Sequence, residues 1–224
     1  LGFLSIISAI EGFYLRAAYL IIAASIFDGM DGKLARWIQA PSKFGSELDS
    51  LADLVSFSVA PAVLIWTIYT SDLPVIPGAL IAGAPLFAGA IRLARFNVSQ
   101  HSDPKPYFEG LPAPVGALVI ISLILYYSPT SYTGADKLVL PMVIAVSFLM
   151  VSQIRYTKTP MLTVRAGLGN TLYLLGTVGT LFIALFIERR FLLPMVLIYL
   201  LSGIVRWLMR TDARVDFRSV EKKI

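Results

Sequence analysis

Long apolar segments follow one another along almost the whole of this 224-residue chain. A helix rises 1.5 Å per residue and needs about 20 apolar residues to cross the roughly 30 Å hydrocarbon layer of a membrane. The segments cover about 1–10, 12–38, 46–70, 73–97, 111–128, 137–155, 168–187 and 191–209. The first is too short to span, and because the chain opens on Leu1 we expect part of that helix to be missing. The pattern predicts an all-α, polytopic transmembrane bundle of about eight helices.

The composition agrees with a lipid environment. Hydrophobic residues make up 57% of the chain and charged residues 15%, and the mean hydropathy is +0.75. The connections carry Pro, Gly and Ser without a low-complexity linker, so we expect one integral membrane domain over 1–224. The chain has no cysteine and one histidine, His101, which excludes disulfides and thiolate zinc sites and argues against an imidazole metal cluster.

Lysine and arginine are unevenly divided between the two ends of the expected helices. If the eight segments cross the membrane in alternation, 15 of the 19 basic residues fall on one side, and Arg16, Lys137, Arg189 and Arg190 fall on the other. Cytoplasmic loops carry such an excess of positive charge, so we expect the basic side to be the cytoplasmic face of the cell membrane. The net charge of +5 and the basic tail at about 210–224 indicate contact with anionic membrane lipids. No nucleic-acid-binding module is recognisable, so no nucleic acid partner is expected.

Four aspartates interrupt the apolar pattern at that face, in the stretches FDGMDGKLAR and GSELDSLAD. At 100° per residue, one helix carries a polar or small face, and after a break at 41–45 the next helix carries a matching one. The first face comprises Asp28, Asp31, Gly32 and Ala35, with Arg36 at its margin; the second comprises Gly45, Asp49, Ala52, Asp53 and Ser56. A helical hairpin would bring both faces to one membrane boundary.

Four facing carboxylates indicate a site for divalent cations. Like charges a few Å apart cannot all stay ionised without compensation, and two divalent ions would bring the formal charge near zero. Such ions bind phosphate oxygens, and a carboxylate can take the proton of an attacking hydroxyl, which suits phosphoryl chemistry. The residues do not form a P-loop, because Leu34 follows Gly32 and Lys33, nor an EF-hand, whose third position would be Met30.

The spacing Asp28-Gly29-x-x-Gly32-x-x-Ala35-Arg36, then Gly45-x-x-x-Asp49-x-x-x-Asp53 after eight residues, resembles the signature of the CDP-alcohol phosphotransferases. Members of that family are membrane enzymes that join a CDP-activated lipid or alcohol to a second alcohol and release CMP. The resemblance implies a homodimer with two divalent cations, Mg²⁺ or Mn²⁺, held by Asp28, Asp31, Asp49 and Asp53. It also implies Asp53 as the general base, and a CDP site lined by Gly32, Ala35, Arg36 and Gly45.

A second region resembles the bacterial and archaeal phosphatidylserine synthase branch of that family. It comprises Arg92-Leu-Ala-Arg95-Phe-Asn97, the stretch from Lys105 through Phe108 to Pro114, and Ser56–Phe57 with Ala60–Ala62. The resemblance implies transfer of a phosphatidyl-type group from a CDP-lipid, with ester- or ether-linked chains, to the hydroxyl of L-serine in phospholipid biosynthesis.

The residues themselves suggest how such an acceptor would bind. Arg92 and Arg95 share a helix face and can bind a carboxylate bidentately, and Asn97, Lys105 and Phe108 continue on the same side.

Two alternatives remain at this point. A related transferase would use glycerol phosphate or inositol phosphate, and the two arginines would then bind phosphate. A metal ion transporter would also place aspartates in the membrane, yet it gives no reason for the small residues at Gly32, Ala35 and Gly45.

Overall fold

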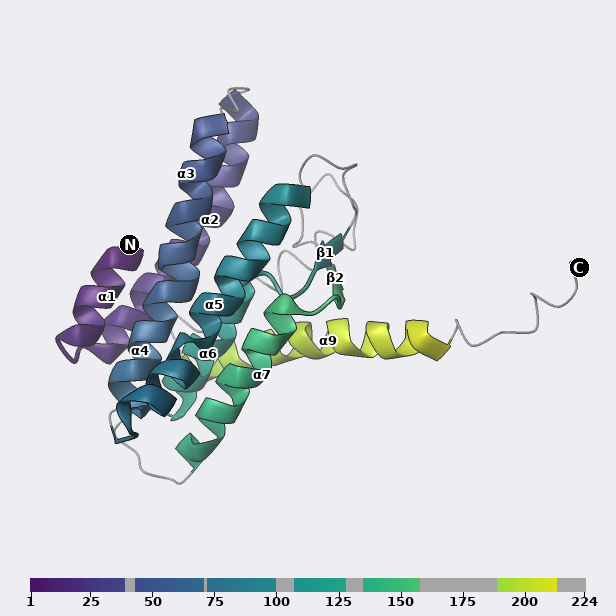
Figure 1. Ribbon diagram of the computed structural model, residues 1–224. Helices are drawn as coiled ribbons and strands as arrows, with labels where there is room; N and C mark the ends of the chain where they lie inside the picture. Colours follow the sequence, from purple (N-terminus) through teal and green to yellow (C-terminus); the bar gives the residue numbers. More distant parts are fainter. Residues whose placement is uncertain (39–42, 71, 100–106, 128–134, 158–188, 213–224) are drawn as a thin grey trace, which may run out of the picture.

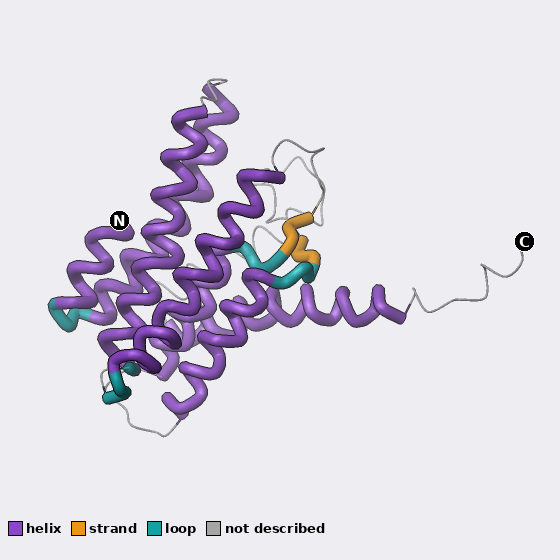
Figure 2. Tube along the Cα trace, viewed as in Figure 1, coloured by secondary structure: helices purple, strands orange, loops and turns teal. Residues whose placement is uncertain are grey.

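The computed structural model describes residues 1–38, 43–70, 72–99, 107–127, 135–157 and 189–212, and this part of the chain is almost entirely helical (Figures 1 and 2). In chain order the elements are α1 (Gly2–Ile10), α2 (Tyr14–Ile38), α3 (Lys43–Leu54), a π-helical turn (Val55–Val59), α4 (Ala60–Tyr69), α5 (Val75–Ser99), β1 (Tyr107–Glu109), α6 (Ala113–Tyr127), a 3-10 turn (Ala135–Leu138), α7 (Val139–Val151), β2 (Arg155–Thr157), a 3-10 turn (Arg189–Phe191) and α9 (Leu192–Asp212).

Seven of the eight predicted apolar segments are helical in the described residues, and the eighth, 168–187, lies outside them. Among the described residues, three helices are long and apolar enough to cross a membrane, namely Phe44–Tyr69, Val75–Val98 and Arg189–Met209, and α6 and α7 are shorter apolar helices. Large apolar side chains such as Phe87, Phe148 and Ile198 are exposed on the outside of the bundle, as contact with lipid requires. These features confirm the predicted fold class, a polytopic helical membrane protein.

The prediction of a helix over 137–155 is wrong at its end. Helix α7 stops at Val151, and Arg155 begins strand β2, which pairs antiparallel with β1 so that Phe108 lies opposite Tyr156. Strands of three residues separated by more than forty positions leave no local period in the sequence, so this pairing was not predicted.

A π-helical turn joins α3 to α4 directly after the aspartates of α3. Pro61 has no backbone N–H, so the hydrogen bond that a regular helix would make to the Phe57 carbonyl is absent. The N–H of the preceding residue, Ala60, donates to the carbonyl of Val55, five residues earlier, which is the π-helical pattern. Helix α5 packs closely against this turn, since a Cβ added at Gly89 would overlap the buried Ser58 side chain. Small residues at such a contact allow helices to approach closely within a membrane.

The core lies among α2, α4, α6 and α7 and includes Ile21, Leu64, Ile120, Ile124 and Val143, all 1% exposed or less. Helix α1 folds back on α2, where the Ser5 hydroxyl donates a 2.9 Å hydrogen bond to the Ala17 carbonyl. Helices α2 and α3 run in opposite directions and extend together past the rest of the bundle at one end (Figure 1). One part of α2 and α3 therefore packs against the core, and the aspartates lie along the part that extends beyond the core.

Candidate active site

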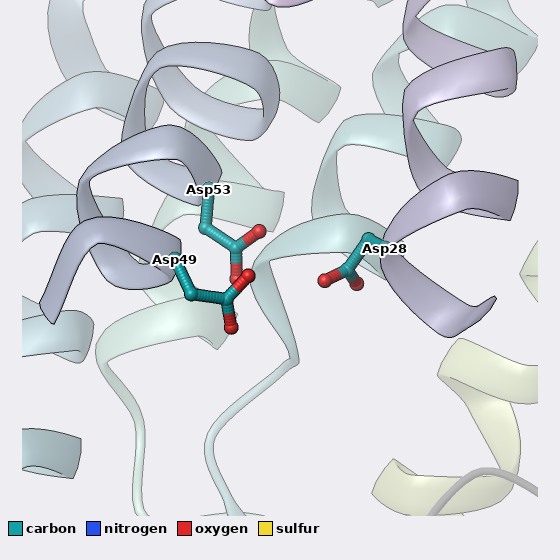
Figure 3. Close-up of side chains that lie close together, drawn as sticks. All are labelled: Asp28, Asp49 and Asp53. Atoms are coloured by element: carbon teal, nitrogen blue, oxygen red, sulfur yellow. The ribbon is translucent and has the colours of Figure 1, made fainter. Parts of the chain in front are cut away.

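Three carboxylates meet between α2 and α3. Asp28 lies on α2, and Asp49 and Asp53 lie one turn apart on α3. Figure 3 shows the three side chains directed toward one another from these helices, and one carboxylate oxygen from each lies within 4.8 Å of the other two. Asp49 is exposed, whereas Asp28 and Asp53 are half-buried. Three of the four aspartates that the sequence predicted to face one another on two successive helices thus form one acidic cluster.

This cluster has the geometry and chemistry of a metal site. Carboxylate oxygens are hard ligands that suit Mg²⁺, Mn²⁺ and Ca²⁺, and ligands at about 2.1 Å on opposite sides of one ion stand about 4.2 Å apart. Only two of three ligands can stand opposite each other, and ligands on adjacent sides of the ion stand about 3 Å apart. Oxygens that already lie within 4.8 Å of one another reach these spacings by side-chain rotation. A divalent cation would also offset the mutual repulsion of the three carboxylates. The residues present therefore fit a divalent cation.

The remaining residues of the predicted motif lie at the free end of the same helix pair. Asp31, Gly32, Ala35 and Arg36 belong to the last two turns of α2, and their side chains lie outside the described part of the structure. Gly45 is exposed in the first turn of α3, across from that end of α2. Their predicted contacts with metal and CDP stay predictions.

Helix α5 brings Arg92 to the cluster. The half-buried Arg92 guanidinium interacts electrostatically with the carboxylate of Asp53 and with the side chain of Tyr199. Its Nε is buried and has no hydrogen-bond partner among the residues that the structure describes. A buried guanidinium N–H without an acceptor costs free energy, which a ligand carrying an acceptor oxygen would recover. Among the described residues, Arg92 therefore places a positive charge beside Asp53.

The structure places the other predicted acceptor residues further out. Arg95 is exposed and donates a 2.6 Å hydrogen bond from Nη1 to the Val151 carbonyl at the end of α7. Asn97 donates from Nδ2 to Oε2 of Glu47 at 3.4 Å, which links α5 to α3. These contacts hold the C-terminal end of α5 against α3 and the end of α7.

Two predicted acceptor residues cannot be placed as side chains. Lys105 lies outside the described residues, and Phe108 lies in β1 but its side chain is not described.

The sequence alone did not single out Tyr199. It lies on α9, in an apolar stretch where a tyrosine looks like any other membrane-helix aromatic. Only the folded chain shows that α9 returns to the site and packs against α6 and β2.

The fold and the carboxylate cluster define a helical membrane protein with a candidate cation site held between two helices. Comparison with known sequences then gives the family. The sequence model of the CDP-alcohol phosphatidyltransferases matches residues 1–151, and the chain belongs to that family.

Three relatives resemble most of the chain. The CDP-diacylglycerol--serine O-phosphatidyltransferase of Helicobacter pylori is 34% identical over 216 residues, which cover 93% of this chain and 86% of the relative. The enzyme of the same name from Methanocaldococcus jannaschii is 33% identical over 92% of this chain and 90% of its own length. The archaetidylserine synthase of Methanothermobacter thermautotrophicus is 37% identical over 70% of this chain and 64% of its own length.

Proposed function

We propose that this chain transfers a phosphatidyl-type group from a CDP-lipid to the hydroxyl of L-serine and releases CMP, as a step of phospholipid biosynthesis. The names of its relatives support this reaction, because two of them are serine phosphatidyltransferases and a third is an archaetidylserine synthase. The structural observation that carries the proposal is the meeting of Asp28, Asp49 and Asp53 within 4.8 Å, with the Arg92 cation beside Asp53.

The acidic cluster would hold two divalent cations, Mg²⁺ or Mn²⁺, with Asp31 joining the three clustered carboxylates. Once bound, such cations polarise the diphosphate and offset the charge that builds up on the departing CMP. The protein's own contribution is to fix the carboxylates on two helices that the core orients, so that little rearrangement is needed when the substrate binds.

The CDP group would lie along the small residues of the helix pair. Gly32, Ala35 and Gly45 offer no large side chain that would block a nucleotide diphosphate from the helix backbone. Arg36 at the margin of this face would pair with a phosphate oxygen. The lipid chains would remain among the apolar helices while the diphosphate reaches the polar boundary.

Serine would enter on the side of α5. Its carboxylate would pair with Arg92, whose buried Nε–H has no partner in the described structure. Arg95, Asn97, Lys105 and Phe108 would form the outer wall of this acceptor site. A carboxylate held by Arg92 would place the serine hydroxyl near Asp53, since Arg92 and Asp53 already interact.

The chemical step is a single displacement in this proposal. Asp53 accepts the proton of the serine hydroxyl, and the serine oxygen forms a bond to the phosphorus that carries the lipid. The bond from that phosphorus to the bridging oxygen of the diphosphate breaks, and the electron pair leaves with CMP. No separate nucleophile is needed, because the acceptor oxygen attacks directly.

The site would face the cytoplasm from the cell membrane. The excess of basic residues on one side of the chain supports this orientation, and the basic tail at about 210–224 would rest on anionic lipid. We also propose that the chain forms one membrane domain and works as a homodimer, as the family resemblance implies.

An acceptor panel tests the proposal. Purified protein in lipid nanodiscs would receive a CDP-lipid, Mg²⁺ or Mn²⁺, and either serine, glycerol phosphate or inositol phosphate, and CMP release would be measured. We expect release with serine, its loss in Asp53→Asn, and normal release in Asp72→Asn, which changes an exposed carboxylate in the turn after α4. CMP release with glycerol phosphate or inositol phosphate, and none with serine, would mean that the acceptor is that phosphate compound. Metal flux without CMP release would overturn the proposed transferase activity.

Exchange of labelled CMP tests the order of steps. A single displacement predicts no rapid exchange of CMP into CDP-lipid when serine is absent. Rapid exchange without serine would instead require an intermediate on the protein, and the single-displacement step would then be wrong.

A further inference from the structure

The small sheet holds a tyrosine against α9. Strands β1 and β2 pair in the register Phe108 to Tyr156. Directly after β1, the Gly110 N–H donates a 2.9 Å hydrogen bond to the carbonyl of Ile154, which lies between α7 and β2. The Tyr156 side chain is 1% exposed, although it comes from a connecting strand. Its hydroxyl is buried with no hydrogen-bond partner in the described part of the chain, so packing of the ring fixes this residue.

The Tyr156 ring packs on two residues of α9. It stacks on the ring of Tyr199, with centroids 5.8 Å apart and planes 21° apart. One turn later, a Cβ added at Gly203 would overlap the Tyr156 ring, so glycine alone leaves room for it. Strand β2 thus fixes the rotational position of α9 and the direction of the Tyr199 side chain.

Tyr199 links this stack to the candidate active site. Its side chain interacts electrostatically with the Arg92 guanidinium, which in turn interacts with Asp53. A phenol oxygen can accept a hydrogen bond from a guanidinium N–H, and an arginine without such a restraint tends to close onto a nearby carboxylate as a bidentate pair. Arg92 closed onto Asp53 could neither bind an anionic acceptor nor leave Asp53 able to take a proton.

We propose that Tyr199 is a positioning residue of the acceptor site, which holds the Arg92 guanidinium open toward the anionic group of the acceptor. Tyr156 and Gly203 hold Tyr199 in turn. This inference rests on the proposed function and adds to it residues beyond 151, where the match to the family's sequence model ends. The acceptor site is thereby completed by the small sheet and α9.

The proposal predicts different effects on the binding of the two substrates. Arg92 meets the acceptor, whereas the diphosphate lies along α2 and α3, so a disturbed Arg92 weakens acceptor binding first. In this proposal the Tyr199 hydroxyl accepts a hydrogen bond from the Arg92 guanidinium, and the loss of a hydrogen bond to a charged group changes binding by about tenfold or more. The ring of phenylalanine keeps the stack on Tyr156, so Tyr199→Phe removes the hydroxyl while retaining the packing.

The experiment measures CMP release by Tyr199→Phe while serine and CDP-lipid are varied separately. We expect the KM for serine to rise about tenfold, while the KM for CDP-lipid stays within about twofold of wild type and the Tm is unchanged. Serine alone should also protect wild type against thermal unfolding at lower concentrations than it protects the variant. Tyr126→Phe, at the exposed end of α6, is the matched control and should behave as wild type.

Gly203→Ala provides a second test, since its added methyl group displaces the Tyr156 ring. We expect the same rise in serine KM, here with a lower Tm. The control is Gly83→Ala on α5, whose Cβ would meet only the exposed Phe87 ring, at 3.3 Å.

Three results would overturn the inference. They are an unchanged serine KM in Tyr199→Phe, an equal loss toward both substrates, and a loss of activity that only follows a lower Tm. If wild type instead uses a phosphate acceptor, the proposed function fails, and the same KM comparison with that acceptor still decides the role of Tyr199.

Discussion

The Asp28 carboxyl on α2 and the Asp53 carboxyl on α3 lie close enough to share a hydrogen bond. Two such groups can share a proton or share a cation. If they share a proton, neither is a free base, whereas a cation between them lets both stay ionised. In the proposed reaction, Asp53 can therefore accept the proton of the serine hydroxyl only when the cluster holds a cation.

Removal of divalent metal should abolish activity for this reason. We expect CMP release to stop in the presence of a chelator and to return with Mg²⁺ or Mn²⁺. Asp49→Asn removes the exposed ligand of the cluster and should raise the metal concentration needed for half-maximal activity by at least about tenfold, whereas Asp72→Asn should leave it unchanged. Full activity of a metal-free protein would contradict the metal assignment.

The two arginines of α5 should differ sharply when each is changed to glutamine. Arg92 interacts with Asp53 and has a buried Nε, so Arg92→Gln should lower kcat/KM for serine at least about a hundredfold, or about 3 kcal/mol. Arg95 is exposed and donates to the Val151 carbonyl, so Arg95→Gln should cost about 1 kcal/mol of stability and change kcat/KM less.

Kinetics with serine varied, together with thermal unfolding, distinguishes these two roles. Equal kinetic losses in the two variants would mean that both arginines contact the acceptor.

The meeting of Asp28, Asp49 and Asp53 could be predicted from the sequence because these residues lie on two helices that follow each other in the chain. Asp49 and Asp53 lie one helical turn apart, and a short break guarantees that the helix carrying Asp28 lies beside them. The apolar segments likewise gave the helices, since 3.6 residues per turn and membrane thickness leave few alternatives.

Contacts between distant segments could not be predicted in the same way. Tyr156 belongs to a three-residue strand and Tyr199 to an apolar helix. Neither element has a sequence pattern that predicts which distant segment it contacts. The π-helical turn has a local cause in Pro61, yet a proline near the start of a helix usually only marks that start. Its i to i−5 bond depends on the tertiary contacts that keep α3 and α4 continuous.

Gly110 should be intolerant of substitution because two effects combine there. Its φ is +78°, where a side chain is strained, and a Cβ would collide with the Met150 carbonyl oxygen. Gly12 has a similar φ of +82° with nothing within 4 Å of its Cβ position, so it supplies the matched control. We expect Gly12→Ala to cost about 1 kcal/mol and Gly110→Ala clearly more. Equal losses in thermal or denaturant unfolding would show that the backbone around Met150 adjusts.

Tyr156 should make stability depend on alkaline pH. Burial raises the pKa of its phenol from an ordinary value near 10 to about 12. Below pH 10 both the folded and the unfolded chain keep this proton, so Tyr156 adds no pH dependence there. Between pH 10 and 12 the unfolded chain loses the proton while the folded chain retains it, so the free energy of unfolding falls by about 1.4 kcal/mol per pH unit.

Tyr156→Phe isolates that contribution. The variant removes a buried hydroxyl that lacks a partner in the described structure and keeps the ring on Tyr199, so at neutral pH it should be as stable as wild type or more stable. Between pH 10 and 12 the stability of the variant relative to wild type should increase, because only wild type has a buried phenol at residue 156 that must stay protonated in the folded state. Tm measured across this range, beside Tyr126→Phe as an exposed control, checks the expectation. A constant difference between wild type and Tyr156→Phe would mean that the phenol reaches water in the folded protein.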